Sequence, residues 1–302
     1  MNTFRYLIGI SWRSIVVGIG YIAALLAVGI ISGLLGVQMS SSPGSESILI
    51  WVLISGVVMA LFLGPLAARM QVSRWRHIVI WTSVIFFNMG SVAIEGAIFA
   101  PELVSVPLPV LFGQQLAASV TVAVLILFLF SSPSKTISFL EIIRLRPWYA
   151  WGWRFVLSSL SYLLFYYVFG AVNYAVVTGP YYTTHAGGLT VPPTGVILAV
   201  ESIRAPLIVL SVALFVLSFQ ASKRRIMVIT GLMLFWIGGI APLLLQVSTL
   251  PLILLAASAV EIFFQNFLTG MVTAGLLWTP FSQVPTSIGP VHSPRPVKNL
   301  AI

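Results

Sequence analysis

Five polar side chains recur every three or four residues within one long apolar stretch: Ser258, Glu261, Gln265, Thr269 and Thr273. Side chains at this spacing lie along one face of an α-helix. A carboxylate within an apolar helix can bind a proton or a cation, and placing a charge at mid-membrane costs about 3 kcal/mol on insertion scales. We therefore expect this face to point into the helix bundle or into a water-filled cavity. If the protein is a transporter, Glu261 would be the proton or cation site.

Two further apolar stretches carry ionisable residues. Asn88, Ser91 and Glu95 follow the same helical spacing, with Glu95 close to one end of its stretch. Glu201 and Arg204 are three residues apart, so they can pair on one helix face. Arg204 is expected to hold Glu201 or to orient a substrate carboxylate.

Six of the nine tyrosines lie between residues 162 and 182. Tyr162, Tyr166 and Asn173 share a predicted helix face, and a loop rich in Gly, Pro and Thr follows. This pattern predicts a pocket that opens outward above Glu201 and Arg204, walled by four residues: Asn173, Tyr181, Tyr182 and His185. The alternative is an aromatic belt at the membrane interface, capped by a structured loop.

The same polar residues also have a structural interpretation. Amides such as Asn88, Gln265 and Asn266 stabilise helix pairs by about 0.6 kcal/mol per hydrogen bond in measured membrane proteins. Glu201 and Arg204 would then be a self-neutralising pair that fixes packing. Three functions stay open: a transporter or permease for a small solute with proton or cation involvement, a non-catalytic membrane subunit, scaffold or sensor, and an intramembrane enzyme using Glu261 as acid and base.

Motifs for metal, cofactor and nucleotide chemistry are absent from the sequence. There is no Cys, no His-Glu-x-x-His, no Gly-x-Ser-x-Gly and no Walker A motif. The three histidines, His77, His185 and His292, fall in separate regions, and His77 is expected to be exposed. We predict no metal and no cofactor, and these residues match no family motif.

The composition identifies the elements that must position these residues. Of 302 residues, 59% are hydrophobic and 7% are charged, whereas a soluble domain is about 25% charged. A membrane-spanning helix needs about 20 mainly apolar residues. The chain is therefore predicted to be an all-α, polytopic membrane bundle of eight helices, near residues 14–37, 48–68, 78–100, 109–131, 155–177, 195–219, 226–248 and 251–278.

The basic residues predict the orientation of this bundle. With eight spans, 14 of the 15 Lys and Arg residues fall on the side of both termini, and Arg204 is the exception. This bias predicts that both termini lie on the cytoplasmic side of the membrane. The membrane is expected to be the cell membrane (inner or plasma membrane). The net charge of +9 is then explained by topology and by contact with anionic lipid headgroups, without nucleic acid.

Short motifs recur in the same order in both halves of the chain. For example, Leu-Ala-Ala-Ser occurs at 116–119 and at 255–258. We expect a parallel 4+4 internal repeat, divided into a first four-helix unit (1–133), a cytoplasmic amphipathic linker (134–153), a second four-helix unit (154–279) and a mobile cytoplasmic tail (280–302). A protein partner or a homo-oligomer is left open.

Overall fold

The computed structural model describes residues 3–37, 45–101, 106–131, 139–185 and 188–279. Within these ranges the secondary structure is helical and contains no strand. Eight helices are long and apolar enough to cross a membrane. The predicted all-α, multi-pass membrane bundle is therefore confirmed. Residues 134–138 of the predicted linker and the tail at 280–302 lie outside the described residues.

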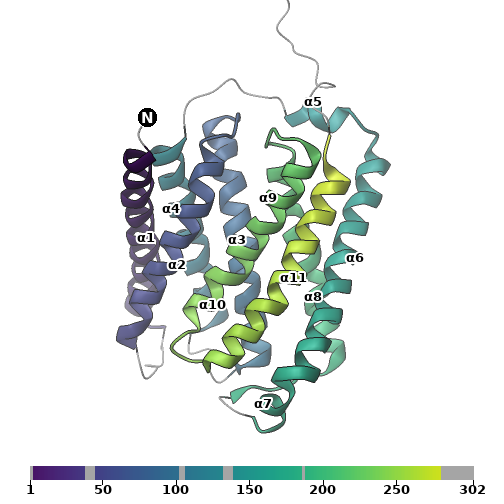
Figure 1. Cartoon of the computed structure of the whole chain (residues 1–302). Coiled ribbons are helices and arrows are strands. Elements are labelled where there is room, and N and C mark those ends of the chain that lie inside the picture. Colours follow the sequence, from purple (N-terminus) through teal and green to yellow (C-terminus); the bar gives the residue numbers. More distant parts are fainter. Residues whose placement is uncertain (1–2, 38–44, 102–105, 132–138, 186–187, 280–302) are drawn as a thin grey trace, which may run out of the picture.

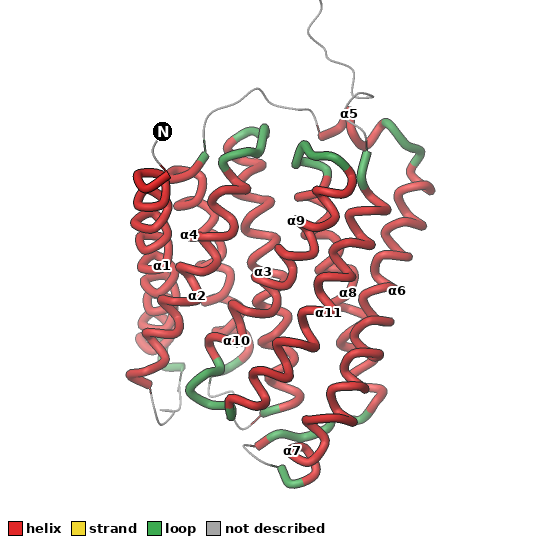
Figure 2. The backbone as a smooth tube through the Cα atoms, viewed as in Figure 1, coloured by secondary structure: helices red, strands yellow, loops and turns green. Residues whose placement is uncertain are grey.

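The helices follow one another along the chain and run side by side along one axis (Figures 1 and 2). The first half contains α1 (Thr3–Leu34), α2 (Ser45–Ala67), α3 (Arg74–Phe99) and α4 (Leu108–Phe130). The second half contains α5 (Phe139–Arg144), α6 (Trp148–Asn173), η2 (Tyr174–Thr178), α7 (Gly179–Thr183), α8 (Thr194–Val216), α9 (Lys223–Phe235), η4 (Trp236–Ile240), α10 (Ala241–Leu245) and α11 (Leu252–Leu277).

The eight predicted spans match eight helical segments, with differences at their ends. The fifth segment, predicted at 155–177, runs from Trp148 to Thr183 because the π-helical turn η2 joins α6 to α7 without a break. The seventh segment runs from Lys223 to Leu245 through a second π-helical turn, η4. Single π-helical turns inside α-helices occur frequently at functional sites.

Each half of the chain contains several extensive helix–helix contacts. In the first half, α1 packs against α2 and α4, and α4 also contacts α2 and α3. In the second half, α6 packs against α8 and α11, and α11 also contacts α8 and α9. The halves meet where α3 packs against α8 and where α2 packs against α10.

Close helix packing depends on glycine at two crossings. A Cβ atom on Gly56 would lie 2.8 Å from the Cα of Gly18, where α2 crosses α1. A Cβ atom on Gly270 would lie 2.6 Å from the Cα of Gly231, where α11 crosses α9. Small residues let helix backbones approach closely in membranes, where association depends on van der Waals packing rather than on expulsion of water.

Candidate functional site

Arg204 lies at the centre of a charged cluster between the two halves of the bundle. One of its guanidinium nitrogens, Nη1, lies 2.5 Å from Oε1 of Glu201 on the same helix and 3.0 Å from Oε2 of Glu95 on α3. The side chains of Arg204 and Glu201 are 5% and 0% exposed, and that of Glu95 is 30% exposed. The predicted pair of Glu201 and Arg204 is present, and Arg204 also bridges to the first half of the chain.

One face of α6 supplies a hydrogen-bond donor to each of three glutamates. The Tyr162 hydroxyl donates to Glu201 over 2.9 Å. The Tyr166 hydroxyl donates to Glu95 over 3.2 Å. The Asn173 side-chain amide donates to Oε2 of Glu261, on α11, over 2.5 Å.

The two tyrosines and the asparagine occupy one helix face because they follow at i, i+4 and i+11. Their shared face was predicted, but their glutamate partners were not. Tyr162 and Tyr166 were therefore absent from the predicted set of site residues.

Glu261 lies against a glycine of α6. A Cβ atom on Gly170 would be 3.3 Å from Oε1 of Glu261, so the small residue leaves room for the carboxylate beside Asn173. Asn173, which bonds Glu261, lies seven residues after Tyr166, which bonds Glu95, on the same helix α6. Three carboxylates and one guanidinium thus gather where α3, α6, α8 and α11 meet, with two formal negative charges in excess if all are ionised.

The cluster lies in one half of the membrane-spanning region. At a rise of about 1.5 Å per residue, Glu95 lies about 6 Å before the end of α3, Glu201 about 10 Å from the start of α8 and Glu261 about 14 Å from the start of α11. All three helix ends belong to the end of the bundle that carries α7 (Figure 1). Since charges are costly in hydrocarbon, pairing and hydrogen bonding are needed to keep them there.

Asn88 and Ser91 share α3 with Glu95 but belong to a second polar group. The Asn88 amide donates to the Val84 carbonyl over 2.7 Å and lies 3.4 Å from the Ser211 hydroxyl. The Ser91 hydroxyl donates to the Asn88 carbonyl over 2.9 Å. The bond between Asn88 and Ser211 joins α3 to α8 about two turns away from Glu95, whereas the other two bonds lie within α3.

A glycine at the π-helical turn η4 completes this second group. A Cβ atom on Gly238 would lie 2.9 Å from Oδ1 of Asn88 and 3.1 Å from Nδ2 of Asn266. The Asn266 amide donates to the Leu234 carbonyl over 3.2 Å. Two buried amides, from α3 and α11, therefore meet the backbone of η4, as expected for interhelical hydrogen bonding.

The polar face predicted on α11 is buried along most of its length. Gln265, Thr269 and Thr273 are buried, while Ser258 and Glu261 are partly buried. The Thr269 hydroxyl donates to the Gln265 carbonyl over 2.7 Å, and the Thr273 hydroxyl is buried without a hydrogen-bond partner. A helix face with these residues is directed away from lipid.

Tyr181 and Tyr182 of α7 pack against a small apolar cluster formed by Ala100, Leu189 and Leu254. The Tyr182 ring lies 6.3 Å from the ring of Phe99. The α7 segment therefore contacts the end of α3 and the start of α11.

The other two residues predicted to wall the outer pocket are His185, which contacts the backbone of Leu189 in this cluster, and Asn173, at the end of α6. His185 is exposed, adopts a positive φ of 51°, and has Nδ1 3.3 Å from the Leu189 carbonyl. Asn173 is the last residue of α6, within the predicted fifth span, and is bonded to Glu261. An outer pocket at this place stays a prediction.

The expectation that His77 is exposed is wrong. His77 is 2% exposed, because it lies in the first turn of α3 on the side that faces the ends of α2 and α4. Its Nε2 is 2.7 Å from the Ser131 hydroxyl, and its ring packs edge-on against Trp81 at 6.0 Å. The spacing of His77 and Trp81, at i and i+4, was the available sequence signal for a shared buried face.

Comparison of the chain with models of known families, with curated proteins and with solved structures gave no match. Within the part of the chain that the structure describes, no three His, Asp or Glu side chains gather closely enough to hold a metal ion. The feature of the molecule that bears on function is therefore the glutamate cluster, formed by Glu95, Glu201 and Glu261 with Arg204.

Proposed function

We propose that the protein is a permease for a small solute, with a proton or cation bound at the glutamate cluster. The observation that carries this proposal is the bridge from Arg204, in the second half, to Glu95, in the first half. In secondary transporters, substrate and coupling-ion sites lie at the interface between structural repeats. An ion pair that joins the two halves can break and form again as the halves move against each other.

The charge balance supports a cationic partner. Arg204 neutralises one of the three carboxylates, so an added proton or cation reduces the remaining excess of negative charge. Glu261 is the proposed site for it, because its hydrogen bond in the structure comes from Asn173, a neutral amide, whereas Glu95 and Glu201 are paired with Arg204. Arg204 would orient a substrate carboxylate or hold Glu201.

The order of helix contacts supports a parallel repeat. If α1 to α4 correspond to α6, α8, α9–α10 and α11, the pairs described above touch in each half, and the contact of α3 with α8 is equivalent to that of α2 with α10. This is the pattern of a twofold axis along the membrane normal. The recurring sequence motifs follow the same correspondence.

The placement of basic residues supports cytoplasmic termini. The start of α1 and the end of α11 lie at the same end of the bundle (Figure 1). Apart from Arg204, most bases with described side chains belong to helix ends or connections at that end: Arg69, Arg74, Arg76, Arg144, Arg146, Arg154, Lys223, Arg224 and Arg225. Arg13 lies about 15 Å into α1 from the same end. Such a bias marks the cytoplasmic side.

The alternative is a non-catalytic subunit in which the cluster only fixes helix packing. It is favoured by the hydrogen bonds that each of the three glutamates already accepts from α6. In a subunit of this kind the cluster stays dry at all times, whereas a permease must expose it to water from at least one side.

Water access to α11 distinguishes these functions. Because the chain has no cysteine, single-cysteine variants at Ser258, Gln265 and Thr269 need no other change. In sealed proteoliposomes, we expect a membrane-impermeant maleimide to modify these thiols, and the side of access to depend on the direction of an imposed pH gradient. Cysteines at Leu160 and Leu164, which are 53% and 59% exposed in the middle of α6 and face the lipid, are controls that should stay unmodified.

Charge neutralisation tests the role of Glu261. Glu261→Gln should remove the dependence of labelling on the pH gradient, while Glu141→Gln on α5, outside the spans, should leave it unchanged. If all three α11 thiols are protected from both sides under every gradient, the permease proposal is wrong and the subunit alternative stands.

A further inference from the structure

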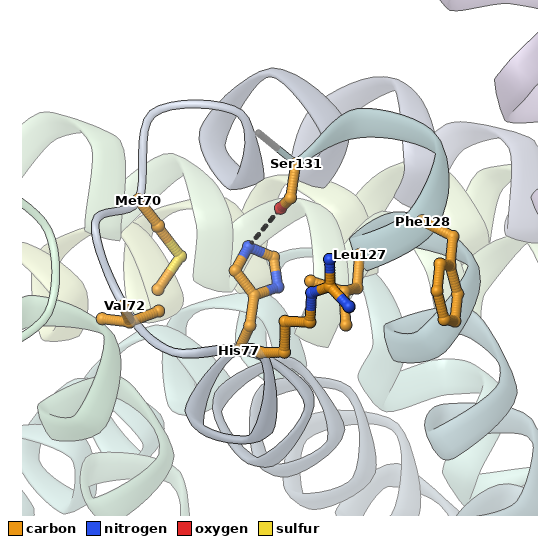
Figure 3. Close-up of a pocket in the computed structure, with 7 residues that line it drawn as sticks. Met70, Val72, His77, Leu127, Phe128 and Ser131 are labelled. Atoms are coloured by element: carbon orange, nitrogen blue, oxygen red, sulfur yellow. Dashed lines mark hydrogen bonds between the residues drawn. The ribbon is translucent and has the colours of Figure 1, made fainter. Parts of the chain in front are cut away.

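A cavity of about 120 Å³ lies at the opposite end of the bundle from α7, where α2 ends, α3 begins and α4 ends. We call it the His77 cavity. Its polar lining comes from Arg74, His77 and Ser131, and its apolar lining includes Leu127 and Phe128 (Figure 3). His77 lies 18 residues before Glu95 on α3, about 27 Å along the helix. The cavity is therefore separate from the glutamate cluster.

One buried nitrogen of His77 lacks a hydrogen-bond partner. The ring directs Nε2 toward the Ser131 hydroxyl at 2.7 Å (Figure 3) and toward the Ala67 carbonyl at 3.3 Å. Its other nitrogen, Nδ1, is buried and unpaired. A neutral ring that donates from Nε2 to the Ala67 carbonyl has an unprotonated Nδ1, whereas a ring that accepts the Ser131 hydroxyl proton at Nε2, or a charged ring that keeps the Nε2 proton for Ala67, carries a proton on Nδ1. The proposed site uses this protonated Nδ1. A buried donor without an acceptor is costly, so this side of the ring favours an added acceptor atom.

The charges around the cavity favour an anion. Arg74 is the first residue of α3, and the N–H groups of a first helical turn have no carbonyl partners within the helix. The carbonyls of Ala67 and Leu127, at the ends of α2 and α4, already accept backbone N–H groups from Met70 and Ser131. No glutamate lines the cavity among the residues described.

The position of the cavity identifies the source of the anion. Phe128 lines it and is 71% exposed, and the neighbouring Trp75 is 72% exposed. Aromatic side chains of this kind lie at the level of lipid headgroups, and this end of the bundle carries the basic residues. We propose that the His77 cavity binds the phosphate of an anionic phospholipid, with Arg74 and the Nδ1–H of His77 on the phosphate and Phe128 beside the lipid glycerol and upper chain.

The affinity of the full chain for phosphatidylglycerol tests this site. Purified protein in detergent is titrated with fluorescent phosphatidylglycerol, and with phosphatidylcholine of the same chain length. We expect Arg74→Gln to weaken phosphatidylglycerol binding about tenfold, as loss of a charge-assisted hydrogen bond would. Arg224→Gln is the matched control, because Arg224 is an exposed base at the same end of the bundle, in the first turn of α9. It should leave the affinity within about twofold.

A second measurement reports on the ring itself and keeps the buried His77 intact. In a variant with His185→Gln and His292→Gln, His77 is the remaining imidazole, because the chain has three histidines. Its ¹⁵Nδ1 resonance should shift with phosphatidylglycerol and not with phosphatidylcholine. An equal shift with inorganic phosphate would assign the site to a free anion and overturn the lipid proposal. Equal losses of phosphatidylglycerol affinity for Arg74→Gln and Arg224→Gln would mean that the lipid is attracted by diffuse surface charge, and would overturn the proposal. A His77 resonance that does not shift with phosphatidylglycerol would mean that the cavity stays empty, and would overturn it as well.

Discussion

Replacing Arg204 by Met tests whether the cluster is held by charge compensation. The substitution removes the cation from Glu201, which is fully buried, and from Glu95, which is 30% exposed. Breaking a buried pair by removing one partner costs about 3–5 kcal/mol, because an uncompensated charge remains. Water screens the more exposed Glu95, so we assign it about 1 kcal/mol at most. The expected loss for Arg204→Met is therefore about 4 kcal/mol of unfolding free energy.

A second substitution separates unpaired charge from lost packing. Glu201→Gln added to Arg204→Met removes the stranded carboxylate while keeping its shape, so it should recover about half or more of the loss. The measurement is unfolding of the purified chain in mixed detergent micelles, followed by helical circular dichroism. Arg224→Met, at an exposed base, is the control and should change stability by about 0.5 kcal/mol or less.

Two results would refute this reasoning. A loss below about 1 kcal/mol for Arg204→Met would place the pair among weak, solvated ion pairs. An equal loss for Arg204→Met with and without Glu201→Gln would mean that the cost arises from packing of the arginine stem instead of from the charge.

Three further predictions concern other parts of the bundle. Tyr162→Phe should lower the unfolding free energy by about 1.5–3 kcal/mol, and Tyr166→Phe by less, because the glutamate partner of Tyr162 is fully buried and that of Tyr166 is partly exposed. Gly270→Val should destabilise the chain by about 1–3 kcal/mol in the same assay, since its Cβ would meet α9, whereas Gly152→Ala, with nothing within 4 Å, should be neutral or stabilising. A cysteine at Ser222, the exposed N-cap of α9, should be labelled in intact cells only after the membrane is permeabilised; labelling of untreated cells would reverse the proposed orientation.

Much of the fold could be predicted from the sequence. Long apolar runs predicted all eight membrane helices, because hydrophobic length is a property of each segment alone. Their ends were less predictable. The fifth segment extends through η2 to Thr183, since a π-helical turn changes the hydrogen-bond pattern without a change in composition that could be detected beforehand.

The partners within the candidate site depended on tertiary structure. Helical spacing placed Glu261 on one face of its helix, and placed Tyr162, Tyr166 and Asn173 together on another. It could not predict which donor meets which glutamate, because the pairs are 39, 71 and 88 residues apart in sequence. Those pairings depend on the crossing and relative height of neighbouring helices, which are set by packing.

Arg204 and His77 illustrate this division between sequence and structure. The sequence by itself determined that Arg204 is the one basic residue outside the predicted cytoplasmic set, because numbering the apolar spans along the chain assigns each base to a side of the membrane or to a span. Only the tertiary structure decided that Arg204 bridges to Glu95 of the other half, and that His77 is buried beside Ser131 and not exposed. Spacing along a helix fixes where a side chain points, but its neighbours come from other helices, whose positions are set by the packing of the whole bundle.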